Sequence, residues 1–557
     1  MSSSLETVRT PYAEAYGAFR AETVARRLSG DLEGGVNACL ECCDRHAAAG
    51  RIALAWESQD GRRADYSFAQ LKDGSAQFAH YLTSRGVGAG DVVAGLLPRR
   101  PELLIALLGA WRVGAMYQPL FTAFGPKAIE QRLQTSNAKL VVTDAANRHK
   151  LDALATKPAV MTVTRAEHGE AAAPGDDDFH AALAAMSTDF APVMRRGDDG
   201  MLLMSTSGTT GLPKGVVVPL RALLSIDVYM RDAIDLRPED VFWNVADPGW
   251  AYGLYYAVIG PLLLGHAMTF YDGPFTAQST YRMIETHGIT NLAGSPTAFR
   301  LLMAAGPGPA ERVKGRLRVV SSAGEPLNPE VIRWFAAQIG APIHDHYGQT
   351  EVGMVVNTHH GLEQAQRIGA AGLSMPGFRV VVLDAQGRET PPDTPGELAV
   401  DIARSPLFWF GGYLNQPTPS IAAGYYRTGD LAECSPEGHL SFVGRNDDVI
   451  TSAGYRIGPF DVESALIEHP AVIEAAVVGK PDPERTEIVK AFVILQTGFA
   501  PSAELAEELR QFVKTRLSAH AYPREIAFVE DLPKTPSGKL QRFILRAGER
   551  AAAQAKA

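Results

Sequence analysis

The residues best suited to chemistry in this chain lie in a polar loop between two short apolar runs. Met201–Met204 lead into a segment of hydroxyl side chains and glycines, Lys214 follows, and Val216–Pro219 lead away from it. Glycines let backbone N–H groups approach an anion, hydroxyls add donors and the lysine adds positive charge, which together suit a polyphosphate. The spacing is not that of a Walker loop. A flexible surface loop is the alternative interpretation, and the flanking strands with the ordered Pro213–Gly215 argue against it.

Further short motifs follow this loop along the chain. They are Ser322–Pro326, Tyr347–Glu351, Tyr426–Asp430, Gly444–Asp448, Ala453–Arg456 and Pro533–Lys539. Taken in this order, they make the sequence resemble the adenylate-forming superfamily of acyl-CoA synthetases, luciferases and peptide-synthetase adenylation domains. The resemblance covers nearly the whole chain and is greatest to medium-chain and acetyl-CoA synthetase-like acid–thiol ligases. It implies an enzyme that converts a carboxylic acid and ATP to acyl-AMP and pyrophosphate, and then passes the acyl group to coenzyme A.

The same resemblance implies an ATP and Mg2+ site. Tyr347 would stack on the adenine, Thr350 would bond the α-phosphate, and Glu351 would offer Mg2+ an oxygen ligand, since this ion usually takes only one or two protein carboxylates. Asp430 is similar to the family's acceptor of the ribose hydroxyls, and Arg445 to its ribose or phosphate donor; alone, each would be interpreted as a surface ion-pair partner. The other implied ATP-binding residues are Thr206, Ser207, Gly208, Thr209, Thr210, Gly211, Lys214, Gly324, Glu325, Pro326, Asp345, His346, Gly348, Gln349 and Lys539.

Lys539 is the residue that we expect to act in the first step, together with Thr350 and Glu351. A carboxylate and the α-phosphate repel each other, and negative charge builds on the bridging oxygen as pyrophosphate leaves, so an ammonium group at this point stabilises the transition state. The resemblance implies that Lys539 is carried by a mobile small domain, and that an acetyltransferase and a deacetylase are possible partners. The alternative is an ordinary solvated lysine.

The second step needs a new lining of the site rather than a catalytic His or Cys, because a free thiol has a pKa of about 8.5 and is partly ionised near neutrality. The resemblance implies that the small domain turns about Asp447 to present a loop to coenzyme A. The implied coenzyme A contacts are Ala453, Gly454, Tyr455, Arg456, Arg485 and Lys514, although a solvated face fits the last two nearly as well. Ala453 and Ala521 depart from residues common in relatives, which leaves the contact details open.

The acyl pocket is expected to be lined by Trp250, Ala251, Ala323 and Gly348. In acetate enzymes of the family a Trp stands at the position of Gly348, and a branched residue stands at that of Ala323. Both differences would deepen the cavity. Four more buried methylenes at about 0.8 kcal/mol each would give a preference over acetate of roughly a hundredfold. We therefore expect a medium-chain, branched or aromatic acid.

Other functions stay open at this stage. An acetate- or propionate-CoA ligase would use the same chemistry on a smaller acid. An adenylation enzyme that loads a carrier protein is also possible, although no carrier module follows before Ala557. Luciferase-type oxygenation has no support in the motifs, and the intact Glu351, Asp430 and Lys539 argue against a catalytically inactive nucleotide-binding protein.

The elements that must position these residues alternate between strand and helix patterns. Lys139–Asp144, Met201–Ser205 and Leu317–Ser321 are predicted strands, and Pro101–Val113 is a predicted helix. This alternation predicts an α/β protein with parallel sheets. With the resemblance, we expect a large domain at residues 1–446, made of two doubly wound α/β subdomains and a β-rich subdomain, and a small mobile α+β domain at residues 447–557.

Composition narrows the function further. The 557 residues include 62 acidic and 53 basic side chains, a net charge of −9, which disfavours nucleic-acid binding. Only four cysteines are present, which indicates a reducing compartment. No secretory signal is readable, and Tyr252–Phe270 contains Pro261 and His266, so we interpret it as a core segment rather than a membrane span. We expect a cytoplasmic protein of undetermined oligomeric state, with Cys39, Cys42 and Cys43 packed in a helix and His359–His360 exposed.

Overall fold

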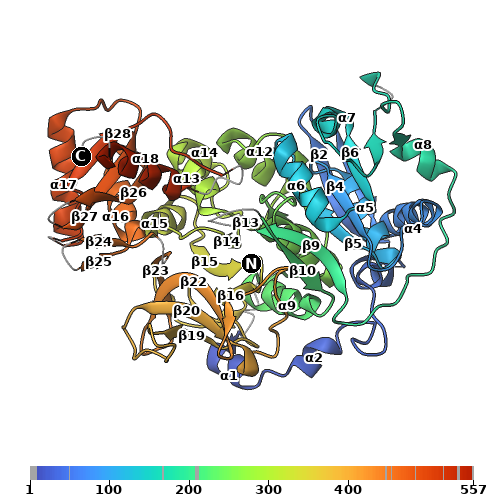
Figure 1. Cartoon of the computed structure of the whole chain (residues 1–557), viewed down its shortest axis with the longest axis horizontal. Coiled ribbons are helices and arrows are strands. Elements are labelled where there is room, and N and C mark those ends of the chain that lie inside the picture. The colour runs from blue at the N-terminus through green and yellow to red at the C-terminus, as the bar shows by residue number, and fades with distance from the viewer. Residues whose placement is uncertain are drawn as a thin grey trace, which may run out of the picture.

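The computed structural model describes residues 9–48, 50–165, 168–206, 213–445, 448–452, 455–482, 485–518, 520–535 and 540–554. Figure 1 shows a large body built on two sheets, a β-rich part at its lower edge, and a smaller red and orange body at one side. The two larger sheets confirm the predicted α/β fold, with its large N-terminal and small C-terminal domains. The exact boundary between these domains stays a prediction, because residues 446 and 447 lie outside the described part of the chain.

One sheet has seven strands in the order β10-β9-β5-β4-β6-β7-β8, all parallel except β10 against β9. Its strands are β4 (Val92–Leu96), β5 (Met116–Pro119), β6 (Leu140–Asp144), β7 (Ala159–Val163), β8 (Asp177–Asp178), β9 (Gly200–Thr206) and β10 (Lys214–Pro219). The associated helices are α4 (Phe68–Ser84), α5 (Pro101–Arg112), α6 (Pro126–Ser136), α7 (Ala145–Arg148), α8 (Phe179–Ala184) and α9 (Ala222–Val228). Helix α4 begins at a capping box in which Ser67 and Gln70 satisfy each other's backbone N–H groups.

The second sheet has nine strands in the order β18-β16-β15-β14-β13-β11-β12-β2-β3. They are β2 (Ile52–Ser58), β3 (Arg63–Ser67), β11 (Phe242–Asn244), β12 (Met268–Asp272), β13 (Asn291–Gly294), β14 (Val319–Ala323), β15 (Ile343–Gln349), β16 (Gly353–Asn357) and β18 (Leu373–Ser374). Its helices are α12 (Ala277–His287), α13 (Pro296–Ala304), α14 (Pro307–Glu311) and α15 (Pro329–Gln338). The run from β15 to β2 is parallel, so polar residues at the carboxyl ends of β14 and β15 meet at one edge.

The smaller sheets are antiparallel for the most part. One contains β19 (Val380–Leu383), β20 (Gly396–Asp401), β21 (Ile421–Ala422), β22 (Tyr425–Cys434) and β23 (Leu440–Arg445). The other is the sheet of the small domain, with β24 (Ile450–Ser452), β25 (Tyr455–Ile457), β26 (Val472–Asp482), β27 (Thr486–Leu495) and β28 (Glu525–Phe528). Its helices are α16 (Pro459–Ile467), α17 (Ala503–Arg516) and α18 (Arg542–Gln554), and its apolar side chains form a core of their own.

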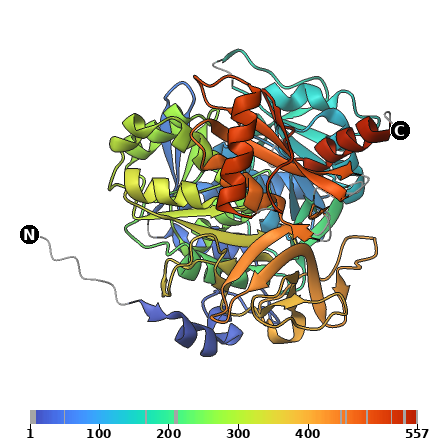
Figure 2. The same cartoon turned by 90° about the vertical axis from the view of Figure 1, so that its left-hand side faces the viewer.

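The N-terminal segment runs along the outside of the large domain. It comprises β1 (Thr10–Pro11), α1 (Tyr12–Gly17), α2 (Ala21–Ala25) and α3 (Arg45–Ala47), and β1 pairs with β17 (Leu362–Glu363). The view turned by 90° shows α1 at the lower edge, apart from the small domain (Figure 2). Cys39, Cys42 and Cys43 are buried here, as the sequence predicted.

The apolar segment from Tyr252 to Phe270 is confirmed as core. It forms α10 (Ala251–Gly253), a continuing helical stretch, α11 (Gly260–Leu264) and then β12, and nearly all of it is buried. Among the described residues, none of the helices combines the length and the apolar character that a membrane crossing requires.

One expectation about two single residues is wrong. His359 and His360 are not exposed: they are 1% and 5% accessible, because their segment packs under the sheet, where His360 stacks on His344 at 3.4 Å.

Candidate nucleotide and acyl site

The polar loop of the sequence is held by a two-stranded frame. β9 and β10 run antiparallel, and Thr206 lies opposite Lys214 in their register. Ser207, Gly208, Thr209, Thr210 and Gly211 lie outside the described residues. The Lys214 ammonium lies 4.5 Å from the centre of the Tyr413 ring. This cation–π contact fixes the ammonium group at the start of β10.

Glu351 lies on the other side of the same tyrosine. The Tyr413 hydroxyl donates to Glu351 Oε1 at 2.9 Å, and the neighbouring Thr350 carbonyl accepts from Tyr255 at 3.1 Å. Glu351 is only 8% exposed, and burial raises the pKa of its carboxyl group. A desolvated carboxylate beside a lysine is suited to a divalent cation that also contacts phosphates, and Mg2+ in such sites commonly takes a single protein carboxylate. The residues present therefore fit the expected Mg2+ site.

A hydrogen-bonded row connects β15 with β22. Tyr347 donates to Asp430 Oδ2 at 2.6 Å, and Gln349 Nε2 donates to the same oxygen at 2.9 Å. Tyr426 in turn donates to Gln349 Oε1 at 2.6 Å. Asp430 is 6% exposed and lies opposite Arg445 in the β22–β23 register. The structure thus brings together residues from three of the sequence motifs.

The end of β14 carries the next motif. Gly324 has φ of 101°, in the left-handed region that favours glycine, and lets the chain turn sharply out of the sheet before Glu325 and Pro326. The Glu325 carboxylate accepts from Thr297 at 2.9 Å and from Arg300 at 3.2 Å. The motif is therefore fixed by residues of α13.

Two titratable residues, Asp345 and His346, directly precede the Tyr347–Glu351 motif and are withdrawn from water. Burial raises the pKa of Asp345 to about 8, so this acid is mostly neutral at pH 7. Burial lowers the pKa of His346 well below its usual value, and its Nδ1 lies 2.7 Å from the Tyr229 hydroxyl. Neutral groups of this kind shape the strand without repelling a phosphate.

The residues expected around the acyl group fall into two sets. Ala323 is 1% exposed and lies opposite His346 in the β14–β15 register, next to Gly348 on the same strand pair. Trp250 packs instead between Phe121 and Phe124, with both ring centres at 5.4 Å. Ala251 opens the helical segment that joins these sets.

Two tyrosines of that helical segment bond residues in or next to the Tyr347–Glu351 motif. Tyr255 is bonded to Thr350, and Tyr256 accepts from the Met354 backbone N–H at 2.9 Å.

A side chain at position 348 would not point into a cavity. A Cβ atom there would stand 2.2 Å from the Gly353 carbonyl oxygen, since β15 and β16 approach closely at a register shift between Tyr347 and Gly348. Backbone fills this space, which removes Gly348 as an argument for a deeper acyl pocket. Of the two positions from which a deeper pocket was expected, only Ala323 still supports it.

The expected coenzyme A residues are on the small domain. Tyr455 is 53% exposed on β25 and stacks on His520 at 4.3 Å, and Arg456 is on the same strand. The Arg485 backbone N–H bonds Asp482, while Lys514 lies on α17 at the outer edge of this domain (Figure 1). Ala453, Gly454, Asp447 and Lys539 lie outside the described residues.

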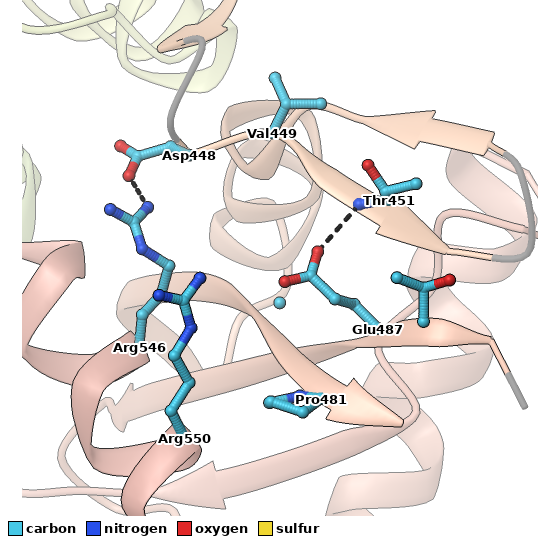
Figure 3. Close-up of a pocket in the computed structure, with 9 residues that line it drawn as sticks. Asp448, Val449, Thr451, Pro481, Glu487, Arg546 and Arg550 are labelled. Carbon is cyan, nitrogen blue, oxygen red and sulfur yellow. Dashed lines mark hydrogen bonds and ion pairs between the residues drawn. The ribbon is translucent and has the colours of Figure 1, made fainter. Parts of the chain in front are cut away.

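A hollow of about 390 Å3 lies within the small domain. Figure 3 shows Arg546 and Arg550 on one wall and Thr451 and Glu487 on another, with an ion pair between Arg546 and Asp448. None of its lining residues belongs to the predicted ATP or acyl residues.

Sequence reasoning missed the residues that hold the motifs in place. Tyr413, Tyr255, Thr297 and Arg300 each bond a motif residue, yet each stands outside the motifs. Tyr426 opens a motif and could have been singled out as a second tyrosine facing the nucleotide. Nothing in the sequence next to the other four residues marks them as part of the site.

Comparison with known proteins agrees with this geometry. The model of the AMP-binding enzyme family matches residues 43–414, and that of the AMP-binding enzyme C-terminal domain matches residues 461–539. Acetyl-coenzyme A synthetase of Bacillus subtilis is 40% identical over 97% of this chain and 95% of its own length. The mitochondrial acyl-coenzyme A synthetase ACSM4 of Rattus norvegicus is 35% identical over 89% of this chain and 86% of its own.

Solved structures give the same result. An acyl-CoA synthetase of Brucella canis is 62% identical with a TM-score of 0.80, covering 98% of this chain and 100% of that one. A benzoate CoA ligase of Burkholderia xenovorans is 28% identical with a TM-score of 0.81, covering 92% and 100%. The chain therefore belongs to the AMP-binding enzyme family, among its AMP-forming acid–thiol ligases.

Proposed function

We propose that this protein is an ATP-dependent acyl-CoA synthetase that prefers a medium-chain, branched or aromatic carboxylic acid to acetate. The observation that carries the activity is the meeting of Glu351, Lys214 and the Asp430 row at the carboxyl edge of the nine-stranded sheet. Open α/β sheets bind their ligands at this edge.

In the proposed first step, the acid's carboxylate attacks the α-phosphorus of ATP and pyrophosphate leaves. Asp430, held by Tyr347 and Gln349, accepts from the ribose hydroxyls. Lys214 and the loop before it hold the β- and γ-phosphates, and Thr350 bonds the α-phosphate. Lys539 neutralises the charge shared by the two reacting anions, which lowers the barrier.

Glu351 would hold Mg2+, with Tyr413 orienting its carboxylate. The ion would supply positive charge to the phosphate oxygens. Without it, Glu351 would add a negative charge next to the triphosphate.

In the proposed second step, the thiol of coenzyme A attacks the acyl-adenylate and AMP leaves. For this, the small domain would turn about Asp447 and bring the Ala453–Arg456 loop to the site. Gly454 would let the pantetheine pass close to the backbone. Arg485 and Lys514 would contact the nucleotide part.

The substrate preference rests on Ala323, a small residue buried at the end of β14. A branched side chain there would shorten the pocket by one or two methylenes, at about 0.8 kcal/mol each. The relatives include both an acetyl-coenzyme A synthetase and a benzoate CoA ligase. The first of these favours a second candidate, an acetate- or propionate-CoA ligase.

A panel of acids tests the proposal. Pyrophosphate release is measured with acetate, propionate, butyrate, octanoate, 2-methylbutyrate and benzoate, each with and without coenzyme A. We expect kcat/KM for one of the larger acids to exceed that for acetate by at least tenfold. Acetate as the best substrate would select the second candidate, and release with no acid at all would refute the synthetase.

A further inference from the structure

A chain of charges that begins at Glu325 of the Ser322–Pro326 motif connects the two domains. Arg300 of α13 donates to Glu325 at 3.2 Å and to Thr297 at 2.7 Å within the large domain. The same guanidinium lies 3.7 Å from Glu474, which belongs to β26 of the small domain. Glu474 is also 2.7 Å from the Lys534 ammonium.

This chain is withdrawn from water. The side chains of Arg300 and Glu474 are each 14% exposed, and that of Lys534 is 28% exposed. Ion pairs at the surface are worth little because water and salt screen them, whereas partly buried pairs with charge-assisted hydrogen bonds are stronger. Glu474 is positioned to hold one cation from each domain.

Lys534 stands at the base of the segment that carries Lys539. The Gln541 N–H donates to the Pro533 carbonyl at 2.8 Å, and Lys534 forms an isolated β-bridge with Leu540. The described residues on the two sides of positions 536–539 are therefore joined. A contact that fixes Lys534 therefore fixes the described residues that lead into positions 536–539.

The far side of the loop is fixed by acids of the small domain. Arg542 donates to Glu463 at 2.6 and 2.9 Å and lies 3.5 Å from Asp448, which Arg546 also contacts (Figure 3). Burial acts to lower the pKa of Arg542, whereas Glu463, with a smaller contribution from Glu325, raises it.

We propose that Arg300 is a positioning residue for adenylation: through Glu474 and Lys534 it holds the residues that flank positions 536–539 beside Glu325 of the large domain. The inference rests on the proposed function, since it assumes that Lys539 acts in the first step. The pair Arg300–Glu474 exists only while the small domain has the orientation seen here. It therefore favours this orientation and has no part in the step that follows its loss.

The variant Glu474→Gln tests the inference, because it removes the bridging charge and leaves Arg300 bonded to Glu325. Adenylation is measured as acid-dependent pyrophosphate–ATP exchange, and thioester formation is measured separately from premade acyl-adenylate and coenzyme A. We expect exchange to fall about tenfold and thioester formation to stay within twofold of the wild type. Retained thioester formation also shows that the variant is folded.

Arg333→Gln is the matched control. Arg333 pairs with Glu468 across the same interface at 3.5 Å, but it is 51% exposed, and its other ion-pair partner is Glu330 of its own helix. We expect its loss to change exchange by less than twofold.

A double variant isolates the pair. If Arg300 acts through Glu474, the loss in Arg300→Gln/Glu474→Gln is smaller than the product of the two single losses. Equal losses in both half-reactions of Glu474→Gln, unchanged exchange, or strictly multiplicative losses would each overturn the inference. A wild-type enzyme with no exchange for any acid would instead refute the proposed function, and the inference with it.

Discussion

At the scale of single residues, the site depends on two acids, Asp430 and Glu351, whose carboxylates are held by hydrogen-bond donors. Asp430 takes two donors from one strand, while Glu351 takes one from Tyr413. A carboxylate with fixed donors keeps its orientation when the ligand leaves, so little has to rearrange on binding.

Tyr347→Phe removes one of the donors to Asp430 and keeps the ring. A hydrogen bond from a neutral donor to a charged acceptor contributes about 1.5 kcal/mol or more, so we expect KM for ATP to rise about tenfold or more with kcat within twofold. Steady-state kinetics measure this. Tyr425→Phe is the control. Tyr425 lies on β22, as Asp430 does, but its hydroxyl bonds the exposed Glu389 at 3.3 Å. An unchanged KM in Tyr347→Phe would contradict the role of Asp430.

Glu351→Gln keeps the shape of the side chain and removes its charge. We expect acid-dependent pyrophosphate exchange to fall at least a hundredfold, because a group that stabilises transition-state charge is worth that much. Raising Mg2+ should not restore the rate. Glu363→Gln, an exposed acid on β17, is the control. A Glu351→Gln enzyme with more than a tenth of wild-type exchange would refute the proposed Mg2+ ligand.

At the scale of elements, the strand pair β15–β16 decides what can stand at Gly348. Gly348→Ala would place a methyl group against the Gly353 carbonyl, and such overpacking costs about 1–3 kcal/mol. Urea unfolding measures the loss. Gly411→Ala is the control, since a Cβ there meets no atom within 4 Å. Equal stability of the two variants would show that β16 yields easily and would reopen Gly348 as a pocket position.

The strand β15 and the segment after β16 also bury several histidines. Burial lowers the pKa of His344 to about 4 and of His359 to about 3, and those of His346 and His360 fall well below their usual value. Below pH 6.5 the unfolded chain binds protons that the folded chain refuses, so stability falls as the pH falls. Asp345, with a pKa raised to about 8, and Asp232 and Asp461, each with a pKa raised to about 6, oppose this trend. His46, whose pKa burial lowers to about 4, adds to the histidines that cause it.

We therefore expect the free energy of unfolding to decrease between pH 7 and pH 5, and His359→Gln to decrease the slope. Urea titrations at pH 7, 6 and 5 measure both quantities. His80, whose ring bonds a carbonyl at the surface, gives the control variant His80→Gln. Equal stability at pH 7 and pH 5 would mean that the buried histidines take up protons in the folded state.

Sequence alone predicted the elements whose pattern is local. The apolar runs of β6 and β9 and the helix α5 lie where expected, because buried parallel strands and amphipathic helices show in neighbouring residues. His359 was missed because a polar pair after a strand is usually solvated, and only the packed sheet buries it. The pair Arg300–Glu474 joins residues far apart in the chain, for which a single sequence holds no signal.

At the scale of the whole molecule, one set of contacts holds the small domain beside the Ser322–Pro326 motif of the large domain. Asn328, the residue before α15, donates to Ser464 of α16 at 2.9 Å, and Arg300 meets Glu474. Phe442 of β23 and Phe460 of α16 add a ring contact at 6.5 Å. In the proposed second step the small domain leaves this position.

The most direct test of that account is Lys539→Ala with the two half-reactions measured apart. Pyrophosphate–ATP exchange reports whether the lysine neutralises the reacting anions, and acyl-CoA formation from premade acyl-adenylate reports the step after rotation. We predict that exchange falls at least a hundredfold while acyl-CoA formation stays within threefold of the wild type. Comparable losses in both steps, or full exchange without Lys539, would contradict a cation that acts once and then withdraws.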